Sequence, residues 1–249
     1  MHEGAPTTSD ISPSARRSVG QMFDDIAPTY DFLNHLLSLA RDCSWRRRAV
    51  GRLDAERPLR VIDLATGTGD LLIAMLRDRP NITEAVGLDL SPNMLDVCRK
   101  KLRQRGRISR ARLLCEDASA TSFPENTFDA AAMAFGIRNT ADVLRTLREM
   151  HRILRPGGTA LVLEFSLPSN ALVRRCYLAY LRVAVPLIGS LVSRDKTAYR
   201  YLNKSIEGFH APQEFLALMR EAGFANVSAV PLTLGVASIY SGVKPLTDT

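Results

Sequence analysis

The segment that most constrains this chain is residues 59–70, which read LRVIDLATGTGD. The apolar, β-branched run at 59–65 is typical of a buried parallel strand, and the apolar run after Gly69 reads as a helix. A glycine turn between a strand and a helix leaves backbone N–H groups at the positive end of the helix dipole. The segment therefore predicts an α/β sheet that binds a nucleotide-like cofactor at this turn.

The rest of the chain alternates between strand and helix patterns, which predicts right-handed crossovers and a parallel sheet. Ser91 and Pro92 mark a helix start, as N-cap and first helical residue. We expect further strands at 84–89, 111–115, 127–134 and 159–165, with a terminal antiparallel hairpin at 226–233 and 235–243. We expect helices at 69–78, 92–105, 140–154 and 212–222, a short one near 118–121, and a turn at 156–158.

The domain organisation follows from composition and from the absence of a linker-like stretch. Hydrophobic residues make up 46% of the 249, enough for one sizeable core. Residues 1–17 are polar and lack an apolar signal-peptide core, and we expect a disordered tail there. We expect one domain over 18–249, with a helical cap at 18–55 and a lid insertion over the substrate at 170–206.

Charge and reactive residues narrow the functional classes. The net charge of +7 suits an anionic membrane surface, nucleic acid or acidic substrates, and equally an ordinary solvated basic surface. Four widely spaced cysteines without a CxxC indicate reduced thiols in a cytosol-like compartment, and the four histidines form no metal-ligand cluster. The apolar stretch 178–192 is too short for a span of roughly 20 residues, so we expect a soluble or membrane-peripheral protein.

The acidic residues near the turn discriminate between cofactors. Leu72 stands where the dinucleotide-binding pattern has its third glycine. Asp89 ends the next strand, where a carboxylate accepts hydrogen bonds from the ribose of NAD or of S-adenosylmethionine alike. Asp63 and Asp70 suit a cationic sulfonium better than a diphosphate, although Asp70 also fits a plain first-turn helix residue. We therefore expect S-adenosylmethionine.

Several motifs together resemble a known family. The first group is similar to class I S-adenosylmethionine methyltransferases in general: 63–70, Gly87-Leu88-Asp89 and 154–158. The second group resembles the ubiquinone/menaquinone biosynthesis C-methyltransferases: Tyr30-Asp31-Phe32-Leu33-Asn34, Trp45-Arg46-Arg47, Phe135-Gly136-Ile137-Arg138-Asn139, 163–166, 199–202 and Ser205-Ile206. The resemblance runs from about Val19 to the last strand. It implies a Rossmann-like, doubly wound, mostly parallel seven-stranded sheet with an antiparallel C-terminal strand.

The resemblance also implies a cofactor site. Carried over by position, Thr68, Asp89 and Asp117 with Ala118 hold S-adenosylmethionine, although a helix N-cap is an alternative role for Asp117. The full set expected at the cofactor is Asp63, Gly67, Thr68, Gly69, Asp89, Asp117 and Ala118. Two positions depart from the family: Ala134 replaces a common serine, and Thr66 replaces a common glycine, so the turn must avoid a positive φ at Thr66 or bear strain.

The reaction implied is methylation of a ring carbon of a prenylated quinol, which requires loss of a phenolic proton. Arg138, after the fourth strand, is expected to stabilise the phenolate. Asn139 would orient the ring oxygen, Tyr30 would wall the pocket, and Tyr201 is a further candidate. The structural alternatives are a surface arginine for Arg138, a helix N-cap for Asn139 and core aromatics for the two tyrosines.

The expected partners follow from this substrate. Residues 170–192 combine apolar and arginine side chains, which suits a helix facing an anionic membrane, or an ordinary helix packed on the sheet. We expect a cytoplasmic protein at the inner face of the membrane, acting on demethylmenaquinol in preference to the ubiquinone precursor, with a homodimer also allowed. The open alternatives are a methyltransferase for another small phenol, a nicotinamide oxidoreductase and a non-catalytic binding protein. A nucleic-acid methyltransferase is disfavoured, because 134–139 lacks the Asn/Asp-Pro-Pro-aromatic run suited to a flipped base.

Overall fold

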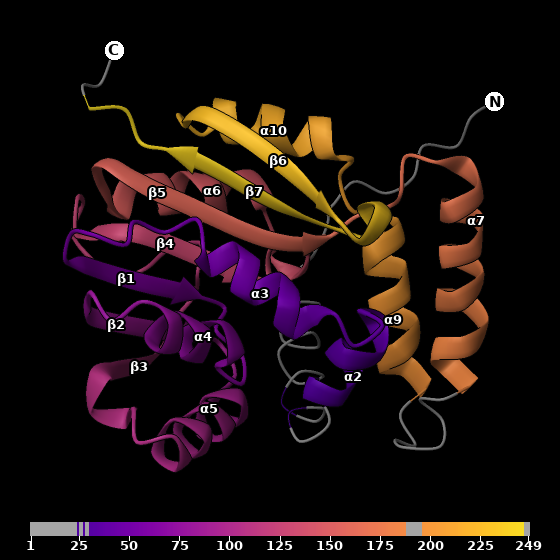
Figure 1. Cartoon of the computed structure of the whole chain (residues 1–249), viewed down its shortest axis with the longest axis horizontal. Helices are drawn as coiled ribbons and strands as arrows, with labels where there is room; N and C mark the ends of the chain where they lie inside the picture. The colour runs from indigo at the N-terminus through magenta and orange to yellow at the C-terminus, as the bar shows by residue number, and fades with distance from the viewer. Residues whose placement is uncertain (1–23, 25–26, 28–29, 188–195, 247–249) are drawn as a thin grey trace.

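The computed structural model describes Asp24, Ala27 and residues 30–187 and 196–246. Its centre is a seven-stranded sheet in the order β3-β2-β1-β4-β5-β7-β6, shown in Figure 1. β7 is antiparallel to both of its neighbours, and the other pairings are parallel. This confirms the expected seven-stranded sheet with its antiparallel C-terminal strand. The strands are β1 (Leu59–Leu64), β2 (Ile82–Asp89), β3 (Ala111–Cys115), β4 (Phe128–Ala134), β5 (Leu154–Phe165), β6 (Ala225–Leu232) and β7 (Ala237–Val243).

Helices cover both faces of the sheet and extend past one edge (Figure 1). Hydrophobic residues of α4 and α5 pack in one core and those of α6 and α10 in the other. Val61 and Ile62 enter opposite cores, which explains the uninterrupted apolar run of β1. The helices are α2 (Tyr30–Leu37), α3 (Asp42–Val50), α4 (Asp70–Asp78), α5 (Pro92–Gln104), α6 (Val143–Ile153), α7 (Ala171–Ala179), α9 (Lys196–Glu207) and α10 (Pro212–Glu221). Short helical turns are η2 (Ile108–Arg110), η3 (Ile137–Asn139), η4 (Tyr180–Ala184) and η5 (Thr233–Gly235).

Local signals at the helix starts are confirmed, and two other expectations are wrong. The Ser91 side chain accepts a hydrogen bond from a backbone N–H of the first turn of α5, with Pro92 as first residue. The short helix expected near 118–121 is a turn, since the Asp117 carboxylate accepts the backbone N–H of Ser119 at 2.8 Å and satisfies it locally. The turn expected at 156–158 lies within β5, at a shift in its register with β4.

The helices α2, α7 and α9 lie beyond the carboxyl ends of the parallel strands (Figure 1). The Tyr180 hydroxyl donates to the carbonyl of Leu36 at 2.6 Å, which joins the segment after α7 to α2. The helix α2 falls within the predicted cap, and α7 and all but the last residue of α9 fall within the predicted lid. The boundaries of cap and lid stay predictions, and the predicted tail at 1–17 lies outside the described residues. No helix among the described residues is long and apolar enough to cross a bilayer.

Candidate functional site

The backbone is constrained where β1 and β4 end. Ala65 and Phe135 follow these strands and have φ of 50° and 57°, which is unusual for residues that carry a side chain. A Cβ on Gly136 would lie 2.9 Å from the Cβ of Ala65, so the two loops approach closely. Thr66 avoids a positive φ, because Ala65 adopts it instead. Such constrained backbone is common at binding sites.

The glycine turn after β1 has a steric basis. Gly67 and Gly69 have φ of 55° and 85°, a region that glycine enters without penalty. A Cβ on Gly69 would also lie 2.3 Å from the Sγ of Cys98 on α5. Gly69 therefore allows both the turn and the close packing of α5 beneath it.

A cavity of about 150 Å³ lies at the carboxyl ends of the strands. Four of the seven residues expected at the cofactor line it: Gly67, Asp89, Asp117 and Ala118. Tyr30 and Asn139 line it as well, so the structure brings two expected catalytic residues into the same cavity as four residues expected at the cofactor.

Asp89 already accepts hydrogen bonds from the surrounding backbone. Its Oδ2 accepts the N–H of Gly67 at 2.8 Å, and its Oδ1 accepts the N–H of Ser91 at 2.9 Å. Burial raises the pKa of this carboxyl, and these two N–H groups oppose the rise. Each oxygen keeps a second lone pair with which to accept a hydroxyl.

A second cavity, of about 20 Å³, is lined by expected site residues that the first cavity lacks. Asp63, Thr68 and Ala134 line it. Asp63 accepts the Thr66 hydroxyl and the backbone N–H of Leu72 on one oxygen, at 2.7 and 3.1 Å. Its other oxygen is buried without a hydrogen-bond partner among the described residues, and burial raises the pKa of Asp63 to about 7.

Two more buried polar atoms that lack a hydrogen-bond partner within the described chain belong to residues lining this cavity. They are Oδ1 of Asn34 on α2 and Nε of Arg46 on α3. Buried polar atoms are normally paired, so a cavity surrounded by two acceptors and one donor indicates a polar ligand. Tyr30, Ala65 and Gly67 line both cavities, so the two cavities adjoin.

Arg138 was expected to face the ligand at the carboxyl edge of the sheet, but its side chain lies in a buried ion pair. Its side chain is buried, and its Nη1 is 2.6 Å from Oε1 of Glu164, which is equally buried. Nη1 also donates to the carbonyl of Phe135 at 2.8 Å, and Nε donates to Oγ of Ser205 at 3.2 Å. Nη2 is buried and has no hydrogen-bond partner among the described residues. Arg138 is therefore no surface arginine, nor does it line either cavity.

Glu164, Asn34 and Arg46 stood in family motifs of the sequence without an expected role, and the structure adds all three to the site. Burial raises the pKa of the Glu164 carboxyl, and the adjacent Arg138 opposes that rise. The available signal for Glu164 was an acidic residue near the end of the apolar strand pattern 159–165, where a lone buried charge requires a partner.

Asn139 connects the β4 loop to the helix α9. Its Nδ2 donates to the carbonyl of Phe135 at 3.3 Å, and its Oδ1 accepts the hydroxyl of Tyr201 at 3.3 Å. The N-cap of α6 is Asp142, so a capping role for Asn139 is excluded. The structure thus places Tyr201 beside an expected catalytic residue.

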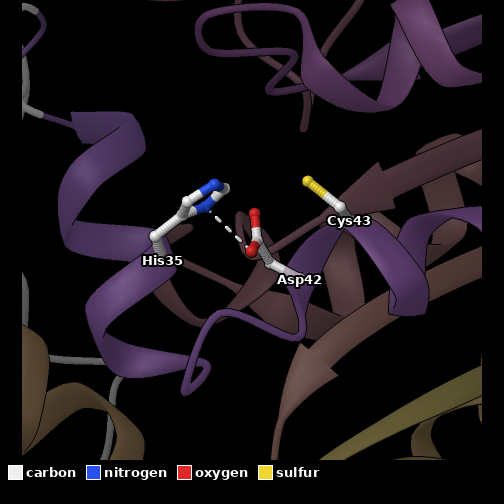
Figure 2. Close-up of side chains that lie close together, drawn as sticks. All are labelled: His35, Asp42 and Cys43. Atoms are coloured by element: carbon white, nitrogen blue, oxygen red, sulfur yellow. Dashed lines mark ion pairs between the residues drawn. The ribbon is translucent and has the colours of Figure 1, made fainter.

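His35, Asp42 and Cys43 lie close together, as Figure 2 shows, with potential ligand atoms within 4.8 Å of one another. The spacing of the histidines gave no sign of this group. The Asp42 carboxylate already accepts Ser38 at 3.2 Å, His35 at 2.8 Å and the guanidinium of Arg46. Because the Arg46 guanidinium is already paired with the Asp42 carboxylate, we interpret the group as part of an ion-pair cluster. The absence of a metal site stays a prediction.

Known proteins resemble this chain both through a family model and through similar sequences. A family model for the ubiE/COQ5 methyltransferase family matches residues 11–244. A demethylmenaquinone methyltransferase of Thermus thermophilus is 46% identical over 224 residues, covering 90% of this chain and 100% of the relative. A ubiquinone/menaquinone biosynthesis C-methyltransferase UbiE of Geobacter sulfurreducens is 43% identical, covering 92% and 89%.

Solved structures share the fold at low identity. A SAM-dependent methyltransferase of Thermotoga maritima matches with a TM-score of 0.63 at 20% identity, over 91% of this chain and 99% of that one. The [4+2]-cyclase SpnF matches with a TM-score of 0.64 at 17% identity, over 98% of both chains. Since one architecture supports both activities, the fold alone does not assign the chemistry. The family model and the similar sequences do carry the assignment, and the chain belongs to the ubiE/COQ5 methyltransferase family.

Proposed function

We propose that this protein transfers the methyl group of S-adenosylmethionine to a ring carbon of a prenylated quinol in menaquinone biosynthesis. The observation that carries this proposal is the identity of 37–46% to relatives named demethylmenaquinone methyltransferase or UbiE, over nine tenths of the chain. The two adjoining cavities at the carboxyl ends of the strands support it.

The residues present fit this cofactor. Asp89 and Asp117 offer acceptors to the hydroxyl and amino groups of adenosine in the larger cavity. In the smaller cavity, the unpaired oxygens of Asn34 and Asp63 suit an ammonium group, and Nε of Arg46 suits a carboxylate. An amino-acid tail carries both groups. Tyr30 then lies between the two ends of one ligand, which places it near the methyl group.

When bound, S-adenosylmethionine supplies an electrophilic methyl group, and the protein must make the acceptor carbon nucleophilic. Ionising a phenol of pKa ~10 at pH 7 costs roughly 4 kcal/mol. We assign this task to the buried positive charge of Arg138, which acts from behind the loop after β4 because the side chain lines neither cavity. Glu164 holds the guanidinium in a fixed orientation. Asn139 and Tyr30 would position the ring oxygen, and a water molecule would take the proton.

A charge-balanced variant tests the role of Arg138. Arg138→Ala alone leaves Glu164 buried and unpaired, which costs about 3–5 kcal/mol of stability. Arg138→Met combined with Glu164→Gln removes both charges together. We expect a fall in kcat of about 100-fold or more, with unchanged affinity for the cofactor. Near-normal turnover by this folded variant would remove Arg138 from the mechanism.

The reaction itself is tested with defined substrates. The protein is incubated with S-adenosylmethionine and either reduced demethylmenaquinone or the reduced ubiquinone precursor, and products are examined by mass spectrometry. We expect a mass gain of one CH₂ unit, larger with demethylmenaquinol. A gain only with a small phenol lacking a prenyl tail would favour the alternative acceptor class. No gain with any reduced quinone would refute the assignment.

We further propose that α7 and the turn η4 after it face an anionic membrane at the inner side of the cell. Leu172, Val183 and Leu187 are 71%, 66% and 66% exposed, and Arg174 and Arg175 are exposed on the same segment. Arg182 is paired with Glu207 at 2.5 Å, so it contributes less net charge to this surface. A prenyl tail would reach its enzyme from such a surface. A homodimer stays a prediction that sedimentation can test.

A further inference from the structure

Four side chains from three elements meet beside the glycine turn. The ammonium of Lys101 on α5 donates to Oδ2 of Asp31 on α2 at 2.7 Å and to Oδ1 of Asp70 on α4 at 2.5 Å. It also donates to the hydroxyl of Thr68 in the turn, at 3.1 Å. Thr68 in turn donates to Oδ1 of Asp31 at 2.5 Å. All three N–H groups of Lys101 therefore have partners that join α2 to the cofactor turn.

A chain of polar contacts leads from Asp70 of this cluster back to the other end of α2. Asp70 also faces the guanidinium of Arg46, at 3.7 Å, and Arg46 pairs with Asp42 on α3. Asp42 pairs with His35 at 2.8 Å (Figure 2). His35 lies in the last turn of α2, while Asp31 lies in its first turn. The helix α2 is thus held in its first turn by the Asp31–Lys101 ion pair and in its last turn by the His35–Asp42 contact, and both sets of contacts reach Asp70 in the first turn of α4.

Burial distinguishes this cluster from ordinary surface ion pairs. The side chains of Lys101 and Asp70 are 14% and 25% exposed and that of Asp31 is 40% exposed, whereas Asp96 in the pair with Arg99 is 63% exposed. Partial burial weakens the screening that makes surface pairs contribute little. Burial would raise the pKa of Asp70, yet Arg46 and Lys101 together hold it below its usual range.

We propose that Lys101 and Asp31 are positioning residues that hold α2 against the glycine turn and so keep Tyr30 and the Thr68 hydroxyl in place for the cofactor. Lys101 and Asp31 line neither cavity, whereas Tyr30 and Thr68 line one or both. The proposal rests on the proposed use of S-adenosylmethionine. Without Lys101, the carboxylates of Asp31 and Asp70 would face each other across Thr68, and their repulsion would favour release of α2.

The test replaces Lys101 by Met, with Lys100→Met as the matched control at an exposed neighbouring position of the same helix. Binding of S-adenosylmethionine and S-adenosylhomocysteine is measured by calorimetry. We expect Lys101→Met to weaken both by roughly tenfold or more, as loss of a partly buried charge pair implies. KM for the cofactor should rise while kcat at saturating cofactor falls less. Lys101→Arg keeps the charge and should restore most of the affinity.

Two further measurements test whether Lys101 acts by holding α2 through Asp31. Hydrogen exchange without cofactor should be faster for the amides of α2 in Lys101→Met and unchanged for those of α10. Asp31→Asn combined with Lys101→Met should cost less than the two single changes added together, because both act through one pair. Additive effects, or binding by Lys101→Met equal to that of Lys100→Met, would overturn the proposal. If the unmodified protein binds no S-adenosylmethionine, the proposed function itself fails.

Discussion

At the scale of single residues, a glycine can be required by its backbone conformation alone, as at Gly106, or also by a close neighbour, as at Gly69. Gly69 and Gly106 both have positive φ, of 85° and 63°. A Cβ on Gly69 would lie 2.3 Å from the Cys98 sulfur, whereas a Cβ on Gly106 would have nothing within 4 Å. We expect Gly106→Ala to lower the free energy of unfolding by about 1 kcal/mol and Gly69→Ala by about 3 kcal/mol. Urea denaturation of the two variants checks this, and equal losses would contradict the steric argument.

Asp63 makes a second residue-scale prediction, on proton release. Burial raises its pKa to about 7. In the cofactor-free protein the carboxyl is therefore about half protonated at pH 7. An ammonium group placed at its unpaired oxygen would lower this pKa, so binding near pH 7 should release about half a proton. Calorimetry of cofactor binding in buffers of different ionisation enthalpy measures this number. No difference between the buffers would argue against an ammonium at Asp63.

The same carboxyl affects stability with a definite sign. Because its pKa is higher folded than unfolded, its contribution is fully present below about pH 4 and is lost as pH rises through about 7. Asp63→Asn should remove this contribution to the pH dependence in the cofactor-free protein. The matched measurement is the midpoint of urea unfolding between pH 5 and pH 8.

At the scale of elements, α7 and η4 carry a prediction about membranes. Leu172 and Val183 are exposed, with Arg174 and Arg175 nearby. Leu172→Ser combined with Val183→Ser should reduce the partition coefficient onto anionic vesicles by at least tenfold, because each buried apolar side chain contributes about 1.5–3 kcal/mol. Arg174→Glu with Arg175→Glu should also reduce it and make it less sensitive to salt.

The matched control is Leu246→Ser, an exposed leucine that lies beside Gly157, near the end of β5 that is remote from α7. We expect normal flotation of that variant. Equal flotation of all variants, or none by the unmodified protein, would remove α7 from membrane binding.

Elements were predictable where the signal is local. Ser91 and Pro92 determine the start of α5 through a hydrogen bond and a preset φ within four residues. The helix predicted near 118–121 was wrong, because the Asp117 carboxylate accepts a backbone N–H to close a turn. The same kind of contact would also begin a helix. The strand β5 begins earlier than expected, since pairing with β4 recruits Leu154 before the glycines.

At the scale of the whole molecule, cofactor binding should raise thermal stability. A ligand at 100 times its Kd stabilises by about 2.7 kcal/mol, which corresponds to a Tm increase of roughly 5–10 °C for a chain of this size. We expect this with S-adenosylmethionine and S-adenosylhomocysteine, and little change with NAD or DNA. A larger shift with NAD would instead favour the oxidoreductase alternative.

The amino-acid sequence by itself determined the parallel sheet, the glycine turn and the class of cofactor. These depend on periodicity, glycines and acidic residues at strand ends, which act within a few positions of one another. Family motifs such as 135–139 and 163–166 added the acceptor class.

Only the tertiary structure decided which charged side chains form ion pairs. Arg138 pairs with Glu164 across 26 positions, and Lys101 pairs with Asp31 across 70. Asn34, Arg46 and Asp63 converge on one small cavity from two helices and a strand. No local pattern encodes such meetings, because the partner of a buried charge depends on which strand ends and helices the packed sheet brings together.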